Sequence, residues 1–240
     1  MITIRKSSTR GYAQHGWLES FHTFSFAEYS DPAYMGYSVL RVINEDKIAA
    51  GTGFGLHPHR DMEIITYMIS GELRHQDSMG NGAVIRAGDV QYMSAGTGVR
   101  HSEINASSSH TAHLLQIWIL PQYAGLTPHY AEQHFSSEQK RNRWCPIASP
   151  LVKETAIQIQ QDVHLDAAML EAGYNLQKKL LPNRCAYLQV VSGTLTCDGE
   201  LLHAGDAAQI EQETVLDLQT TSGAELLWFD LPKEPSSKKA

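Results

Sequence analysis

The sequence predicts an all-β protein built from antiparallel β-barrels. Short apolar runs recur along the chain, bounded by glycine, asparagine and aspartate, a pattern typical of strands joined by tight turns. We expect strands over residues 39–43, 63–69, 90–93 and 114–120, and again over 158–163, 187–191, 193–197 and 226–231. Many short strands at this spacing favour a sandwich or a barrel.

The two halves of the chain share one layout. Residues 69–73 read Ile-Ser-Gly-Glu-Leu and are followed by Ala-Gly-Asp at 87–89. In the second half, 191–195 read Val-Ser-Gly-Thr-Leu and are followed by Ala-Gly-Asp at 204–206. This similarity indicates an internal duplication of one barrel unit.

The duplication divides the chain into two predicted domains. We expect the first barrel over residues 1–130 and the second over 151–240. The segment 131–150 is polar and reads as a connector that can contain a short helix.

The composition argues against several classes of protein. Of the 240 residues, 42% are hydrophobic and 19% are charged, which suits a packed core and not a disordered chain. The chain has no run of 18 apolar residues, and its N-terminus lacks the apolar segment of a secretory signal. We therefore expect a cytoplasmic protein with no membrane partner. The net charge of -7 disfavours direct binding of nucleic acid.

The three cysteines, Cys145, Cys185 and Cys197, are odd in number and show no C-x-x-C spacing. This argues against a disulfide framework and against a thiolate zinc site. We interpret them as small buried hydrophobic residues.

Two pairs of side chains in the first half predict a metal site. His57 and His59 stand two residues apart, as do His101 and Glu103. Because residues i and i+2 of a strand point to the same face, two neighbouring strands would form a four-ligand pocket. Three imidazoles and one carboxylate suit Fe(II), Ni(II), Cu(II), Mn(II) or Zn(II). Four protein ligands leave coordination positions open to substrate or dioxygen.

The residues around these pairs resemble the two motifs of the cupin superfamily, here Gly53, His57, His59 and Glu63, then Gly98, His101 and Asn105. More narrowly, the first half resembles the pirin family over residues 10–18, 22–26, 54–63, 75–80 and 94–103. The nearest resemblance is to bacterial pirin-like proteins with quercetin 2,3-dioxygenase activity. The second half matches through layout and length. The resemblance implies a bicupin, with two jelly-roll barrels packed face to face in a monomer.

The resemblance also implies which carboxylate binds the metal. Many cupins use the glutamate of the first motif, here Glu63. In the pirin family the carboxylate follows the last histidine by two residues, which is Glu103 in this chain. Glu63 is then a group close to the ligands or the pocket, with direct coordination as the alternative. The implied cofactor is one divalent metal ion, iron first, with copper, nickel, manganese and zinc as alternatives.

The second half lacks these ligands. When the shared glycines of the two halves are aligned, the five positions that correspond to the motif residues hold Lys179, Leu181, Cys185, Leu218 and Thr220. No set of metal ligands survives there, so we expect a second barrel without metal and with a structural role.

The implied function is a metal-dependent dioxygenase that cleaves a flavonol such as quercetin at the 2,3 position and releases carbon monoxide. Its substrates would be dioxygen and the flavonol, or a similar small aromatic molecule. On this resemblance, metal binding would lower the pKa of the flavonol 3-hydroxyl, and Glu103 or Glu63 would take the proton as the base.

Two other functions stay open. One is a metal-binding, redox-responsive interaction module of the transcription co-regulator type, since an acidic surface suits protein partners. The other is a cupin enzyme with an unrelated substrate, because this fold supports many reactions.

A flat substrate needs an apolar and aromatic wall. Phe26, Phe54, Met93 and Trp118 are candidates, although each also suits the core.

The remaining ring side chains carry the resemblance without visible chemistry. We interpret Trp17 as a packing residue, and His15 and His22 as hydrogen-bonded structural groups that could alternatively face the pocket. We expect His75 on the barrel surface or in a turn.

Overall fold

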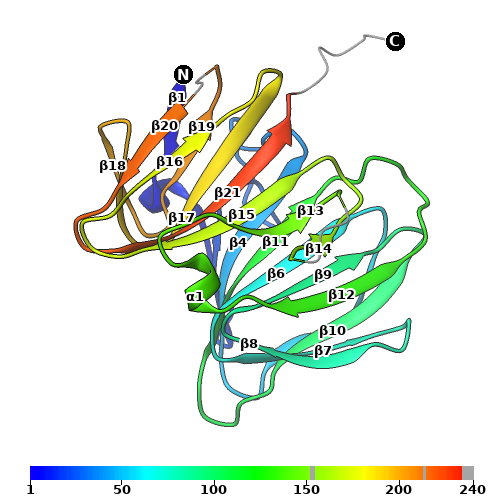
Figure 1. Cartoon of the computed structure of the whole chain (residues 1–240). Helices are drawn as coiled ribbons and strands as arrows, with labels where there is room; N and C mark the ends of the chain where they lie inside the picture. Colours follow the sequence, from blue (N-terminus) through cyan, green and yellow to red (C-terminus); the bar gives the residue numbers. More distant parts are fainter. Residues whose placement is uncertain (152–154, 213–214, 234–240) are drawn as a thin grey trace.

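The computed structural model describes residues 1–151, 155–212 and 215–233, so the end of the second predicted domain lies outside the described part (Figure 1). Strands make up nearly all of its regular structure, and they pair almost throughout in antiparallel sheets. The prediction of an all-β fold with two barrels is confirmed. None of the described helices is long and apolar enough to cross a membrane.

The first half begins with β1 (Ile2–Arg5) and the 3-10 helix η1 (Ser7–Thr9). The strands that follow are β2 (Gly11–Gln14), β3 (Leu18–His22), β4 (Leu40–Ile48), β5 (Gly53–His59), β6 (Glu63–Ser70), β7 (Glu72–Asp77), β8 (Gly82–Arg86), β9 (Asp89–Ser94), β10 (Val99–Asn105), β11 (Ala112–Ile119) and β12 (His129–His134).

The second half follows the helix α1 (Ser137–Lys140). Its strands are β13 (Cys145–Ser149), β14 (Ile157–Gln158), β15 (His164–Leu170), β16 (Asn175–Lys179), β17 (Arg184–Cys197), β18 (Glu200–His203), β19 (Ala207–Ile210), β20 (Val215–Gln219) and β21 (Ala224–Pro232).

Two sheets form the first barrel. The larger has seven strands in the order β12-β9-β6-β11-β4-β3-β2, and the smaller has the order β5-β10-β7-β8. In Figure 1, β7, β8 and β10 lie at the bottom and the larger sheet lies above them. Strand β6 reads Glu-Ile-Ile-Thr-Tyr-Met-Ile-Ser, and its first six residues are all buried. A strand that is buried at successive positions must be covered on both of its faces.

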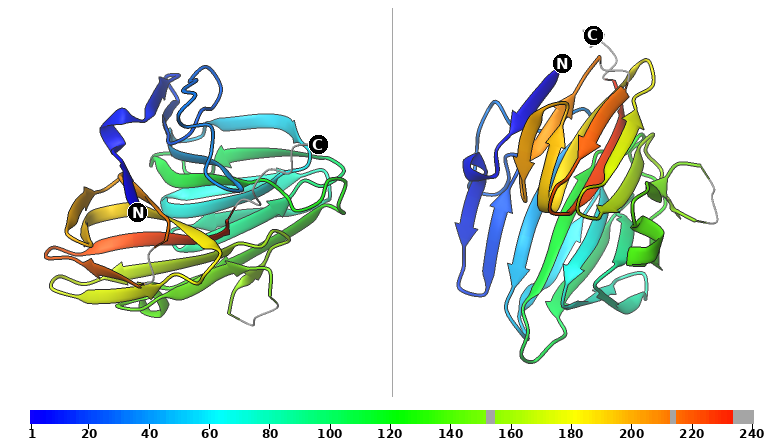
Figure 2. Two further views of the ribbon diagram at one scale, coloured as in Figure 1. Left: turned by 90° about the horizontal axis from the view of Figure 1, so that it is seen from above. Right: turned by 60° about the vertical axis from the view of Figure 1, so that its left-hand side comes forward.

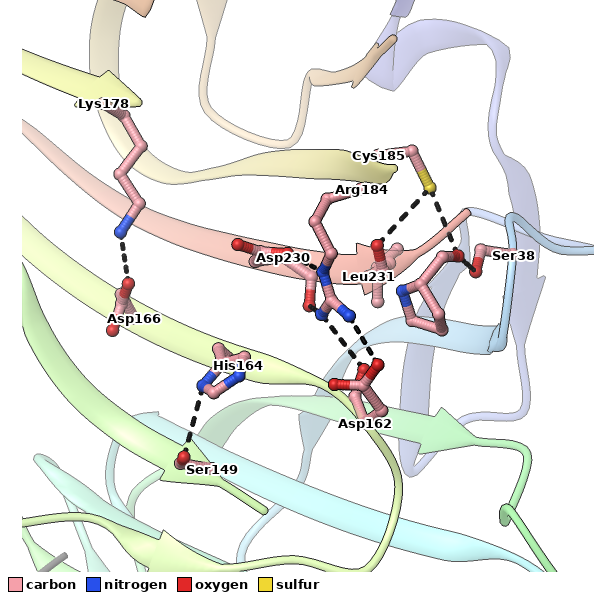
Figure 3. Close-up of polar contacts among 11 residues, drawn as sticks. Ser38, Ser149, Asp162, His164, Asp166, Lys178, Arg184, Cys185, Asp230 and Leu231 are labelled. Atoms are coloured by element: carbon pink, nitrogen blue, oxygen red, sulfur yellow. Dashed lines mark hydrogen bonds and ion pairs between the residues drawn. The ribbon is translucent and has the colours of Figure 1, made fainter. Parts of the chain in front are cut away.

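The second barrel is built around a sheet that contains the path β1-β19-β17-β21-β15-β13-β14. Its interior is filled by a cluster that includes Leu188, Leu226 and Trp228. Near the start of β17, Arg184 pairs with both Asp162 and Asp230, which ties the loop before β15 to β21 (Figure 3).

The largest hydrophobic cluster lies between the two barrels. It joins Ile65 and Tyr67 of β6 to Ile147, Leu165 and Phe229 of the second half. The outer face of the large sheet in the first barrel is therefore covered by the second barrel, and the two barrels lie side by side in both views of Figure 2.

The segments that precede and follow the first barrel in the sequence both pair with strands of the second half. Strand β1 pairs with β19 and so belongs to the sheet of the second half (Figure 2). Within the expected connector, β12 pairs with β9, α1 has a capping box at Ser136, and β13 pairs with β15. The segment 131–150 is therefore structured, and the domain limits at 130 and 150 stay a prediction.

A buried ion pair links α1 to both barrels. The ammonium of Lys140 lies 2.8 Å from a carboxylate oxygen of Glu225 and donates to the hydroxyl of Tyr67 at 2.7 Å. Tyr67 also donates to Glu225. Since Lys140 and Tyr67 are almost fully buried, removal of the cation would leave the largely buried carboxylate of Glu225 without its charge partner.

We expect Lys140→Met to lower the free energy of unfolding by roughly 3 kcal/mol, because the charge of Glu225 then has no compensation. The control is Arg86→Met, because Arg86 pairs with Glu72 at 3.3 Å while its own side chain is 63% exposed. That change should cost less than about 1 kcal/mol. Urea denaturation measures both, and equal losses would contradict a special contribution from the buried pair.

Candidate metal centre

The structure brings the two predicted pairs of ligands together. Strands β5 and β10 are antiparallel neighbours, with His101 opposite His57 and Val99 opposite His59. The ring centroids of the three histidines are 4.4 to 4.8 Å apart. Their potential ligand atoms form a group within 4.8 Å of one another. The three imidazoles can therefore reach one metal ion.

A bulge in β5 sets the position of His57. Between the pairs His101–His57 and Glu103–Phe54, β5 has one more residue than β10. At Gly53, with φ of +156°, an added Cβ would lie 2.1 Å from the carbonyl oxygen of Glu103, so only glycine allows this approach of the two backbones. The bulge lets Nδ1 of His57 lie 2.7 Å from the carbonyl oxygen of Gly55. A proton on Nδ1 then donates to that carbonyl and leaves Nε2 as the ligand atom.

His101 is the most buried of the three histidines. Neither of its ring nitrogens has a hydrogen-bond partner among the described groups, although the side chain is 0% exposed. Burial, followed by the effects of the neighbouring His57, His59 and His75, lowers the pKa of His101 to about 2. Burial, followed by the effect of His57, lowers the pKa of His59 to about 4. Both rings are thus neutral at ordinary pH, which is the form that binds a metal.

Glu103 projects from β10 into the same cluster. It is buried, and it accepts hydrogen bonds from Nε2 of Gln116 at 3.2 and 3.3 Å and from the hydroxyl of Thr66 at 3.4 Å. Burial raises the pKa of Glu103, while the histidines and the two donors oppose that shift. Its carboxylate forms a second potential ligand group with His101 and His75. The two groups share His101 and together contain all four predicted ligands.

The expectation that His75 lies on the surface or in a turn is wrong. His75 stands on β7 directly opposite Glu103 and is 0% exposed. Its Nε2 lies 3.2 Å from Asp77, its Nδ1 lies 3.3 Å from the amide of Gln91, and its ring stacks on Tyr130. Because both ring nitrogens have partners, His75 is held as a neighbour of the cluster, whereas His101 has both nitrogens free to bind.

The structure does not bring Glu63 to the histidines. On β6, Thr66 points toward Glu103, so Glu63, three residues earlier, points to the opposite face. There its carboxylate accepts from the hydroxyl of Tyr92 at 2.6 Å and from the backbone of Gln160 at 2.9 Å. Burial raises the pKa of Glu63. Its contacts support a role at the interface of the barrels and give no support to its assignment as ligand or base.

A cavity of about 560 Å³ opens beside the histidines. Its lining includes the metal-cluster residues His57, His59 and Glu103 and the rings of Tyr12, His15, Trp17, His22, Phe26, Tyr29, Phe54 and Trp118. Three of the four predicted wall residues are therefore at the cavity, and Met93 lies instead in a buried cluster with Ile64 and Val99. His15, His22 and Trp17 also line the cavity, so the alternative expectation for the two histidines holds, whereas Trp17 was expected only to pack.

Comparison with known proteins gives the family of this chain. Residues 3–119 match the family model described as Pirin, and residues 146–231 match the quercetinase C-terminal cupin domain. The chain is 45% identical to quercetin 2,3-dioxygenase of Escherichia coli K12 over 97% of its own length and 99% of that protein. It is 40% identical to a pirin-like protein of Caulobacter vibrioides, over 96% of this chain and 99% of that one.

The chain belongs to the pirin family. Its structure is similar to the crystal structure of YhhW from Escherichia coli, with a TM-score of 0.93, 45% identity, and coverage of 97% of this chain and 98% of that one. YhhW in complex with nickel(II) gives a TM-score of 0.92 at 44% identity, covering 97% of this chain and 99% of that one.

The residues present in this pirin fit a divalent metal ion. The two buried ring nitrogens of His101 have no hydrogen-bond partner among the described groups. Ligand atoms of His57 and His59 lie close to one of them, and ligand atoms of His75 and Glu103 also lie close to the ring. Groups of three or more potential ligands occur in the described residues only around β10. The assignment of His57, His59, His101 and Glu103 as the ligands, and of the second barrel as free of metal, remains a prediction.

We expect about one metal ion per chain after reconstitution, and loss of that ion in His101→Ala. The control is His134→Ala, because the His134 side chain is 62% exposed and pairs with Asp89, away from the cluster. Elemental analysis after gel filtration measures the content. A wild-type protein that retains no metal would overturn the site, as would His101→Ala with unchanged content.

In the metal-free protein, the contribution of His59 and His101 to stability should decline as the pH falls from about 6.5 to about 4. Unfolded histidine titrates near 6.5, whereas folded His59 resists protonation down to about 4 and His101 down to about 2. In that window these two histidines bind more protons in the unfolded chain than in the folded chain, so their titration favours unfolding as the pH falls. His101→Gln should reduce the slope of the free energy of unfolding against pH by at most about 1.4 kcal/mol per pH unit. Urea titrations with a chelator measure it, and an unchanged slope would contradict a buried neutral His101.

Proposed function

We propose that this protein is a metal-dependent dioxygenase that opens the central ring of a flavonol such as quercetin and releases carbon monoxide. The observation that carries the proposal is an aromatic cavity that ends on His57, His59 and Glu103. The relatives named quercetin 2,3-dioxygenase, which match this chain over almost its full length, give independent support.

The aromatic side chains suit a flat substrate. Phe26 and Trp118 meet edge to face at 5.4 Å, and Trp17 and Phe54 do so at 5.1 Å. Trp118 also lies 5.0 Å from the ring of His59. These rings would orient a planar molecule beside the metal ligands and exclude water from it.

Glu103 is the proposed base. Its carboxylate lines the cavity, whereas Glu63 is bonded to Tyr92 and Gln160 on the other face of the sheet. Glu103 would accept the proton of the flavonol 3-hydroxyl, and Gln116 and Thr66 would hold the carboxylate in place for the transfer. A divalent metal bound by the histidines would supply Lewis acidity to the substrate oxygen.

The overall reaction balances without another reductant or oxidant. One dioxygen and one flavonol give one carbon monoxide and one depside, an ester in which both oxygen atoms of dioxygen have been incorporated. Two carbon–carbon bonds of the central ring are broken. We propose iron as the first metal to test, with nickel, copper, manganese and zinc beside it, because imidazole and carboxylate ligands suit all of them.

We expect the reconstituted protein to consume dioxygen and quercetin together and to release carbon monoxide. Glu103→Gln should lower kcat by about a hundredfold or more, because the base is lost. Glu63→Gln is the matched control, since it neutralises the other buried glutamate and should leave kcat within about threefold. Flavonol absorbance, an oxygen electrode and gas analysis measure the three species.

If Glu63→Gln loses activity but keeps its metal, and Glu103→Gln keeps a normal kcat, then Glu63 is the base and Glu103 is not. Metal binding by the wild type without turnover of any flavonol would refute the proposed activity. The interaction module or another substrate would then be the function to test.

A further inference from the structure

A row of polar side chains crosses the inner wall of the first barrel. His22 of β3 stands opposite Asn44 of β4, Asn44 opposite Gln116 of β11, and Gln116 opposite Thr66 of β6. Directly opposite residues of antiparallel strands point to the same face, so these side chains are neighbours on one surface. The row reaches the metal cluster at Gln116 and Thr66, which both bond to Glu103.

Three members of the row have polar atoms without a partner. These atoms are Nδ1 of His22, Oδ1 of Asn44 and Oε1 of Gln116, and none has a hydrogen-bond partner among the described groups. The three residues line the cavity, yet they are only 4%, 3% and 8% exposed. Buried polar atoms normally find partners, because leaving them unpaired is costly. A row of them on a cavity wall therefore indicates a ligand that supplies the missing bonds.

The free atoms define what such a ligand must offer. The amide nitrogen of Gln116 donates to Glu103, which orients the amide and leaves its oxygen as an acceptor. The carbonyl oxygen of Asn44 likewise has no hydrogen-bond partner among the described groups. Burial lowers the pKa of His22, as do His15 and Arg10, so its ring is neutral. Amide oxygens accept and do not donate, so the complementary ligand carries hydrogen-bond donors, which the hydroxyl groups of a flavonol can supply.

The surroundings add the shape of that ligand. His22 meets the ring of Phe26 edge to face at 5.2 Å, and Phe26 in turn meets Trp118. Neighbouring strands are roughly 5 Å apart, so Asn44 and His22 lie roughly 5 and 10 Å across the sheet from Gln116. A planar molecule with its reacting oxygen at Glu103 would thus place a hydroxyl of a more distant ring against them.

We propose that Asn44 and His22 form a hydrogen-bonding subsite for a phenolic hydroxyl of the substrate other than the one that reacts, so that the protein selects polyhydroxylated flavonols over flavonols that carry the 3-hydroxyl alone. This inference rests on the proposed function for its reacting end. The recognition itself requires only that the cavity binds a flavonol.

The test compares quercetin, which has hydroxyls on both outer rings, with 3-hydroxyflavone, which has none there. Asn44→Leu removes the acceptor at similar size and should lower kcat/KM for quercetin by about tenfold or more, mainly through KM. The value for 3-hydroxyflavone should change by less than about threefold. His22→Phe keeps a ring without its nitrogens and should show the same selective loss. Asn44→Thr, which restores an oxygen acceptor, should recover part of the quercetin value.

Met93→Leu is the control, because Met93 is buried in the same barrel outside the cavity lining. It should leave the ratio of the two kcat/KM values unchanged. An equal loss with both substrates in Asn44→Leu and His22→Phe, or no loss with either, would overturn the subsite.

A binding experiment separates this inference from the proposed activity. Trp17 and Trp118 line the cavity, so quenching of tryptophan fluorescence reports flavonol binding to metal-free protein. The wild type should bind quercetin more tightly than 3-hydroxyflavone, and Asn44→Leu should remove that preference. This result in a protein that never turns over flavonols would keep the subsite and refute the dioxygenase. Equal binding of the two compounds by the wild type would refute the subsite, whatever the activity.

Discussion

Burial of the seven-stranded sheet on both faces is the constraint from which the rest of the structure follows. Along β6, Ile64 and Thr66 point into the first barrel, while Ile65 and Tyr67 point out to the second. Because successive side chains of a strand alternate between faces, each strand serves two environments at once. The inner face could therefore become a polar cavity wall, since the outer face already supplies a large apolar core.

The small sheet provides the other half of the site. Strand β10 lies between β5 and β7, so His101 and Glu103 have histidines of both neighbouring strands beside them. Strand pairing holds these imidazoles close together even though none of them gives His101 a hydrogen bond. The unpaired nitrogens reduce the stability of the metal-free fold, and a bound cation would recover that loss. Rigid strands thus maintain a ligand arrangement that loops could not maintain as precisely.

The sequence predicted the fold class and the ligand cluster, because both depend on short-range patterns. The spacing of His57 and His59, and of His101 and Glu103, already determines which side chains share a face. It could not predict the environment of His75, since β7 reads as a polar strand and only its pairing with β10 shows that His75 is buried beside Glu103. The face of Glu63 could have been inferred from the sequence, because Glu63, Ile65 and Tyr67 alternate along one strand and so share a face. The pairing of β1 with β19 has no local signal, because it joins residues about 200 positions apart.

The second barrel contributes to the site through the interface. Glu63, in the first cupin motif, is bonded to the backbone of Gln160, and Tyr67 of the same strand reaches Lys140 and Glu225. Both contacts leave from the outer face of β6, and Thr66 on its inner face bonds to Glu103. A displacement of β6 relative to the second barrel would therefore move Thr66 as well. Through its bonds to Tyr92 and Gln160, Glu63 anchors the strand that lies behind the cluster, and none of these contacts involves a predicted metal ligand.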